Sequence, residues 1–265
     1  MSLHQHVNSS GFPLQLAVAN AVKTHLKSQW DVLYEEHAWS LDRETGFLDL
    51  VLEDQYKTWL MNVECKRVRD SDWIFLKDRK AQAKRRHAKL WVSHRSSKHT
   101  HFDWVDIPMD PDSVESQYCI VPGQDAKARP MLERVAATLV TSTEALAAEE
   151  ARTVADQYSD FRIYQNVIVT TAALQVCEVE VSQIDISKGE IGSNATFIEV
   201  PYVRFRKQLG SVSSDVQPAA DRHSLLRIAK DRESTVFVVN SAHFIDFVRA
   251  CEPPDNLAQY VGAPP

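Results

Sequence analysis

The stretch GFLDLVLEDQYKTWLMNVECK, residues 46–66, contains two segments in which apolar and polar side chains alternate, separated by a polar turn. Alternation with a period of two is typical of β-strands, whose successive side chains point to opposite faces. We therefore predict strands over residues 46–53 and 58–66, joined by a loop over 54–57. The chain should form an antiparallel β-hairpin here.

The loop length sets the register of this hairpin. A loop over 54–57 places Glu53 opposite Thr58, and therefore Asp49 opposite Asn62. One face of the hairpin is then continuously apolar and suited to a core. Its members are Leu48, Leu50, Leu52, Trp59, Met61 and Val63.

The other face of the hairpin is polar and carries Asp49, Asn62, Glu64 and Lys66. Diagonal neighbours on adjacent strands lie roughly 7–8 Å apart at the backbone. The carboxylates of Asp49 and Glu64 can lean across that gap and share one small cation. The register therefore predicts a metal site. The alternative is a solvated strand face on which Glu64 and Lys66 merely form an ion pair.

An acid on one strand, followed by Glu-x-Lys near the end of the next, resembles the pattern of the PD-(D/E)XK nuclease superfamily. Asp49 matches the first acid, Glu64 the second acid and Lys66 the lysine. The resemblance covers residues 1–70, and beyond them only the order of elements agrees. It implies an α/β fold, with a restriction-endonuclease-like αβββαβ core whose central mixed sheet is flanked by helices.

The resemblance also implies roles for these residues. Asp49, Glu64 and the backbone carbonyl of Cys65 would bind Mg²⁺, for which Mn²⁺ would substitute. Lys66 would position or deprotonate the attacking water. The implied activity is that of an Mg²⁺-dependent endonuclease, a hydrolase acting on phosphodiester bonds, most often in DNA.

Two further residues are auxiliary candidates at this site. The first helix of the superfamily often bears another acid near the metal, and the matching position here is Gln15. This departure weakens the case for a second metal, although an amide oxygen can still ligate a cation or orient water. Glu36, on the strand before the hairpin, can approach the site as an acid, and a surface carboxylate is the alternative.

The residue types suit this chemistry without reference to the superfamily. Phosphodiester cleavage builds negative charge on the phosphate oxygens and needs a nucleophile near neutral pH. A divalent cation polarises phosphate and acidifies water. Mg²⁺ prefers one or two carboxylates together with waters and substrate oxygens, which Asp49 and Glu64 would supply. Lys66 can act as a base if its pKa is lowered, or can hold positive charge.

Composition describes an ordinary globular chain of 265 residues, 44% hydrophobic and 25% charged, with a net charge of −6. We find no membrane-spanning run, secretion signal, P-loop, dinucleotide fingerprint or nucleophile elbow. The cysteines show no metal-ligand spacing, so a reducing, cytoplasmic compartment is expected. They are Cys65, Cys119, Cys177 and Cys251.

Positive charge is concentrated in residues 66–101, which contain twelve Lys or Arg and three acids. Clusters of this kind neutralise phosphates and release counterions. Because the cluster begins at the Glu-x-Lys triplet, we predict nucleic-acid contacts within it, while a solvated helix face is the alternative. The residues predicted to contact nucleic acid are Arg67, Arg69, Lys84, Arg85, Arg86 and Lys89.

The remaining pattern predicts a single domain over residues 1–265. The predicted core covers 9–69 and 129–172, the basic insertion 70–128 and a β-rich C-terminal extension 173–252. Helices are predicted over 13–27 (capped by Ser9 or Ser10), 79–91, 130–157 (with a break near 141–143) and 242–250 (capped by Ser241). Further strands are predicted over 31–39, 162–170, 174–180, 198–207 and 235–239, with loops over 92–128 and 210–221.

Two other functional interpretations remain open. The same fold can bind nucleic acid or a partner protein without hydrolysis, and Gln15 favours that alternative. The chain can also be an assembly protein whose apolar C-terminal strands mediate oligomerisation. A homodimer is compatible with cleavage, since cutting both strands of DNA often pairs two sites.

Overall fold

The computed structural model describes residues 2–69, 71–95, 100–125, 127–153, 161–209, 230, 233–252 and 257–260. The helical elements are α1 (Leu3–Ser9), α2 (Phe12–His25), α3 (Met131–Thr153), η1 (Val181–Gln183), η2 (Ser241–His243), α5 (Phe244–Ala250) and α6 (Leu257–Tyr260). The first strands are β1 (Trp30–Leu41), β2 (Glu44–Asp54), β3 (Trp59–Lys66), β4 (Asp72–Asp78), β5 (Arg85–Arg95), β6 (Thr100–Ser113), β7 (Glu115–Ser116) and β8 (Tyr118–Ile120). The later strands are β9 (Phe161–Thr170), β10 (Ala173–Val179), β11 (Thr196–Val200), β12 (Tyr202–Gln208) and β13 (Glu233–Asn240).

Two sheets organise these strands. The larger sheet has the order β1-β2-β3-β9-β13-β12-β7, and β5 joins it by pairing with both β9 and β6. Within it, β1, β2 and β3 are antiparallel, whereas β3, β9 and β13 are parallel. The smaller sheet has the order β11-β10-β4-β8. The predicted α/β class, with a mixed sheet flanked by helices, is confirmed.

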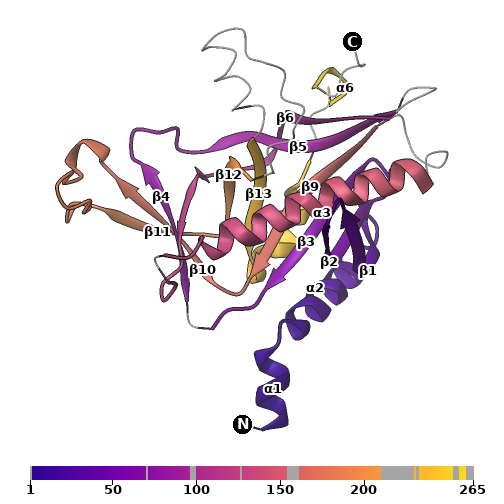
Figure 1. Ribbon diagram of the computed structural model, residues 1–265, viewed down its shortest axis with the longest axis horizontal. Coiled ribbons are helices and arrows are strands. Elements are labelled where there is room, and N and C mark those ends of the chain that lie inside the picture. The colour runs from indigo at the N-terminus through magenta and orange to yellow at the C-terminus, as the bar shows by residue number, and fades with distance from the viewer. Residues whose placement is uncertain are drawn as a thin grey trace.

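The larger sheet has a hydrophobic core on each face. Side chains of α2 and α5 form one core with alternate residues of β2, β3 and β5. The apolar stripe of α3 forms the other core, which extends to the smaller sheet. Figure 1 shows α3 lying across the strands of the larger sheet. We call these the α2-side core and the α3-side core.

Strand β3 reaches β9 through a crossover that includes α3. Because β3 and β9 are parallel, such a connection is required to return the chain to the same end of the sheet. Helix α3 is continuous through residues 141–143, where we predicted a break. The hydroxyl of Thr143 interacts with the carbonyl oxygen of Leu139 and with the Asn166 side chain on β9, so this polar turn is a buried contact with the sheet. Residues 154–157 of the predicted helix lie outside the described residues.

The helix predicted over 79–91 is wrong, because residues 85–95 form strand β5. Ala88, Leu90 and Val92 alternate with more polar neighbours and are fully buried in the α2-side core. The many Lys and Arg residues favour a helix by composition. Pairing with β6 and β9 overrides that local preference.

The loop predicted over 92–128 is also largely wrong. Residues 100–113 form the long strand β6, which contains Pro108 and Pro111. Proline has no backbone N–H and is tolerated on an edge strand. In the described part of the sheet β6 pairs only with β5, so it is such a strand. Within the segment 70–128, β5 extends the central sheet by pairing with β9.

Several helix and strand ends differ from the sequence-based prediction. Helix α1 was not expected, and Ser9 and Ser10 donate to its carbonyl oxygens instead of capping α2, whose N-cap is Gly11. The strand predicted over 198–207 is divided into β11 and β12 at Pro201. The C-terminal helix begins with the 3₁₀ turn η2, capped by the side chain of Asn240 and not by Ser241. The predicted loop over 210–221 lies outside the described residues.

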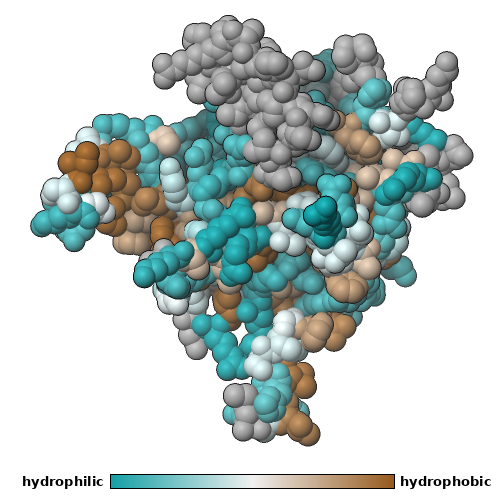
Figure 2. Space-filling view, in the orientation of Figure 1, coloured by the Kyte–Doolittle hydropathy of each residue, from teal (hydrophilic) through white to brown (hydrophobic). Residues whose placement is uncertain are grey.

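Exposed apolar side chains gather at two extremities of the molecule. Helix α1 projects from the body and buries none of its residues (Figure 1). Figure 2 shows hydrophobic residues there and near β11. The exposed apolar residues of these segments include Leu3, Val7, Phe12, Leu16, Ile186, Phe197 and Ile198. Among the described helices, none is long and apolar enough to cross a membrane.

Candidate active site

The register of the β2–β3 hairpin differs from our prediction by two residues. Leu50 pairs with Val63, and Glu53 pairs with Leu60 instead of Thr58. The cause is Asp54, whose carboxylate accepts hydrogen bonds from the backbone N–H groups of Thr58 and Trp59, both at 2.8 Å. An even shift leaves every side chain on the same face. Glu64, not Asn62, is therefore the residue that the shifted register brings level with Asp49.

Strand β2 is irregular at Asp49. The β1–β2 pairing passes from Glu35–Leu50 to His37–Leu48, and the β2–β3 pairing ends at Leu50–Val63, so within the described strands Asp49 has no ladder partner. On β1 the facing residue is Glu36, whose φ of 52° lies in the left-handed region.

This irregularity corrects the predicted apolar face. Leu50 and Leu52 pack in the α2-side core, as expected. Leu48 packs in the α3-side core with Trp39, because the side-chain alternation slips by one position at Asp49. The hairpin therefore has no single apolar surface that includes all three leucines.

The Asp49 carboxylate bridges β2 and β3. Its Oδ2 accepts a hydrogen bond from the backbone N–H of Cys65 at 2.7 Å. The backbone carbonyl oxygen of Asp49 accepts a hydrogen bond from Nε2 of Gln15 on α2 at 3.0 Å. The Cys65 N–H thus donates to the Asp49 side chain, whereas in a regular ladder it would donate to a backbone carbonyl of β2. This bond places the acid of β2 beside Glu64 and Lys66.

The charges of these side chains act on one another. The pKa of Asp49 is raised to about 6, first by burial and next by the charge of Glu64. The Cys65 N–H and the charge of Lys66 lower the pKa of Asp49, and the charge of Glu36 raises it by the smallest contribution. An acid pushed upward by burial and by a second carboxylate is typical of functional sites.

Glu64 and Lys66 form an ion pair at the end of β3. Nζ of Lys66 lies 2.5 Å from Oε1 of Glu64, and the two side chains are 34% and 19% exposed, respectively. Between them, the Cys65 side chain is buried in the α2-side core. Burial, and then the charges of Asp49 and Glu64, raise the pKa of the Cys65 thiol, which favours its protonated form.

The donor set fits a hard divalent cation with few protein ligands. Among the described residues, no group of three or more His, Cys, Asp or Glu side chains is arranged to hold a metal ion. Two adjacent carboxylates whose charges repel are what Mg²⁺ binds, since it keeps several waters. The Cys65 carbonyl remains the predicted third donor.

The two auxiliary candidates, Gln15 and Glu36, differ in burial: Gln15 is buried and Glu36 is exposed. Gln15 is 8% exposed, and its amide nitrogen contacts the backbone of β2. Glu36 is exposed, and its charge reaches Asp49.

Three of the six predicted nucleic-acid contacts form ion pairs with acids of β6 and β7. The pairs are Lys84–Asp112 at 3.3 Å, Arg85–Glu115 at 2.5 Å and Arg86–Asp110 at 2.5 Å. Lys89 is 8% exposed. Arg67 and Arg69 directly follow Lys66, the first half-buried and the second exposed. These two arginines are the predicted contacts that follow the Glu64–Lys66 pair in the chain.

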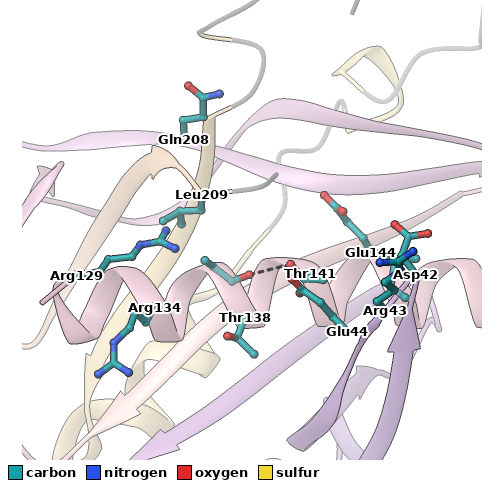
Figure 3. Close-up of a pocket in the computed structure, with 12 residues that line it drawn as sticks. Asp42, Arg43, Glu44, Arg129, Arg134, Thr138, Thr141, Glu144, Gln208 and Leu209 are labelled. Carbon is teal, nitrogen blue, oxygen red and sulfur yellow. Dashed lines mark hydrogen bonds between the residues drawn. The ribbon is translucent and has the colours of Figure 1, made fainter. Parts of the chain in front are cut away.

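A cavity of about 850 Å³ lies elsewhere, between α3, the β1–β2 turn and the end of β12. Figure 3 shows Arg129 and Arg134 extending to opposite sides of the helix, while Arg43 lies near Asp42 and Glu144. The arginines that line this cavity therefore do not converge on one ligand position. Asp49, Glu64 and Lys66 are not among its lining residues.

Sequence reasoning missed a buried ionic cluster beneath α3. Arg162 lies 3.0 Å from Glu53 and 3.4 Å from Glu150, and the hydroxyl of Tyr164 donates to Glu150 at 2.8 Å. All four side chains are at most 9% exposed. The one signal in the sequence was Arg162 itself, the single charged residue of β9.

In comparisons with known proteins, no family model, no curated protein and no solved structure matches this chain significantly.

Proposed function

We propose that this chain is a divalent-cation-dependent nuclease that hydrolyses phosphodiester bonds in DNA, on a restriction-endonuclease-like αβββαβ core. The elements α2, β1, β2, β3, α3 and β9 follow one another in this order, with β4–β8 between β3 and α3, and β3 and β9 are parallel, which supports the proposed core. The observation that carries the function is the bond from the Cys65 N–H to the Asp49 carboxylate. It gathers two acids and a lysine at one strand end.

Asp49 and Glu64, with the Cys65 carbonyl, would hold Mg²⁺ or Mn²⁺. When bound, such a cation polarises a phosphate oxygen and acidifies water. Burial and then the charge of Glu64 raise the pKa of Asp49, and a bound cation would relieve both unfavourable contributions.

Lys66 contributes a positive charge at the same point. Its ammonium neutralises Glu64 and also lowers the pKa of Asp49, so its field covers both acids. A preorganised cation stabilises the negative charge that develops on phosphate oxygens during attack by water. Arg67 and Arg69 extend this positive charge along the chain, and we assign them to contacts with the DNA backbone.

The test is cleavage of single- and double-stranded DNA and RNA by the purified chain in Mg²⁺ or Mn²⁺. We expect cleavage of DNA that stops in excess chelator and is absent in folded Asp49→Ala and Lys66→Ala variants. Cleavage that persists in both variants contradicts the assignment of the site. Binding of DNA without cleavage under any of these conditions supports the non-catalytic alternative.

Asp49→Asn is expected to stabilise the metal-free protein at pH 7 by about 1–2 kcal/mol. The folded pKa of Asp49 is raised from 3.8 to about 6, so folding stability falls as pH rises between these values. The full shift corresponds to about 3 kcal/mol, and partial exposure of the side chain reduces it. Chemical unfolding of the wild type and Asp49→Asn at pH 4 and pH 7 should show the higher free energy of unfolding of the variant only at pH 7. Excess Mn²⁺ should stabilise the wild type alone, because the variant lacks one ligand.

Lys66→Met should bind Mn²⁺ at least as tightly as the wild type while losing cleavage. The Lys66 ammonium competes with a cation for Glu64, so its removal leaves more negative charge at the site. Isothermal calorimetry and a cleavage assay on the same preparation measure the two effects. Weaker Mn²⁺ binding in Lys66→Met would argue against competition between the Lys66 ammonium and the cation for Glu64.

A further inference from the structure

The buried face of α2 contains one polar side chain. The helix buries Gln15, Val18, Ala19 and Val22, which lie on one face at helical spacing. The three apolar residues pack in the α2-side core. Gln15, in the first turn of the helix, occupies a position where an apolar side chain would extend this packing.

Burial of an amide is unfavourable unless the amide is hydrogen-bonded. Nε2 of Gln15 donates to the carbonyl oxygen of Asp49 at 3.0 Å, across 34 positions of sequence. Within the described strands Asp49 takes part in neither ladder, so this amide replaces a ladder donor. The bond therefore ties α2 to β2 at the one position where the sheet does not hold β2.

We propose that Gln15 is a positioning residue that holds the Asp49 carboxylate in place for the cation, an inference that rests on the proposed function of this site. Two hydrogen bonds act in series. Gln15 fixes the Asp49 carbonyl at 3.0 Å, and the Asp49 carboxylate meets the Cys65 N–H at 2.7 Å. The bond from Gln15 restrains the backbone of Asp49, whose side chain accepts the bond from Cys65.

This role differs from that of a metal ligand. The Gln15 amide nitrogen is directed at the backbone of β2, and its bond is made to a carbonyl oxygen, not to a carboxylate. Partners that orient a metal ligand in this way commonly affect metal affinity 10–100-fold (roughly) when they are removed.

The experiment uses Gln15→Met, which keeps a similar volume and removes the donor. In the metal-free protein, we expect hydrogen exchange at the Cys65 amide to increase about tenfold relative to other amides of β3. Calorimetry should show Mn²⁺ affinity lowered by about tenfold. Val18→Ala is the matched control on the same face of α2. It should loosen the helix without a selective effect at Cys65 or on Mn²⁺ affinity.

Gln15→Glu separates the two roles at this position. An ionised carboxylate cannot donate to the Asp49 carbonyl, so above the pKa of the new carboxyl the positioning role predicts the same losses as in Gln15→Met. Tighter Mn²⁺ binding in Gln15→Glu, with normal exchange at Cys65, would identify a ligand and overturn the proposal. Unchanged exchange at Cys65 in Gln15→Met would overturn it as well. If Cys65 exchange rises but the wild type binds no Mn²⁺, the contact is supported and the proposed function of the site fails.

Discussion

Glu64→Gln is expected to lower DNA cleavage in Mg²⁺ by about 10³-fold or more. The variant lacks one of two carboxylates, and a catalytic cation supplies several kcal/mol of transition-state stabilisation. The amide has nearly the same volume as the acid, and Glu64 is partly exposed at a strand end, so the fold should persist. Single-turnover cleavage rates, with circular dichroism as a check on folding, measure the effect.

The matched control is Glu180→Gln, at the residue that follows β10 of the smaller sheet. Glu180 also forms an ion pair with a lysine, since its Oε1 lies 2.7 Å from Nζ of Lys80. The same chemical change there should leave the cleavage rate unchanged. Equal losses in both variants would mean that general destabilisation, not the strand-end carboxylates, limits activity.

The second large effect concerns stability. Arg162→Met is expected to destabilise the protein by about 3–5 kcal/mol, because it leaves Glu53 and Glu150 as buried carboxylates without their cation. Burial already raises the pKa of Glu150, and the charge of Arg162 opposes that rise. Urea unfolding of the wild type and the variant at pH 7 measures the difference.

Arg249→Met provides the comparison for this prediction. Arg249 pairs with Asp246 at 3.4 Å, but these side chains are 49% and 77% exposed. Exposed pairs contribute about 0–1 kcal/mol, so this variant should unfold nearly as the wild type does. A further check is pH. The deficit of Arg162→Met should shrink as pH falls, because the freed carboxylates become protonated. A deficit independent of pH would point to lost packing instead of uncompensated charge.

The sequence predicted the strands that position the site because their pattern is local. Alternation in residues 46–66 identified β2 and β3, and the apolar spacing of α3 predicted the crossover helix. The register was not accessible in the same way, since it depends on the Asp54 carboxylate and its bonds to the loop. Asp49 and Glu64 still interact, because the Asp49 carboxylate accepts the Cys65 N–H although β2 is irregular there.

The errors in 79–128 have a non-local cause. Strand β5 is rich in Lys and Arg and becomes a strand only because β6 and β9 pair with it. Lys84, Arg85 and Arg86 then meet acids of β6 and β7, which no charge count along the chain reveals. Three of the basic residues chosen by charge clustering are thus ion-paired within the protein.

The irregularity at Asp49 was also beyond the sequence. It depends on the left-handed backbone of Glu36, a non-glycine residue, and on the contact between Gln15 and the Asp49 carbonyl. A signal for the latter did exist. Gln15 interrupts a stripe that continues with Val18, Ala19 and Val22, and a polar residue on a buried face usually has a specific partner.

The most direct test of the site is the anomalous diffraction of a crystal soaked in Mn²⁺. We predict one strong peak bound by the carboxylates of Asp49 and Glu64, with the Lys66 ammonium moved from its position on Glu64. Such a peak should be lost in Glu64→Gln. A crystal without a peak at saturating Mn²⁺, in which Lys66 still pairs with Glu64, would contradict the proposal that this strand end is a catalytic metal centre.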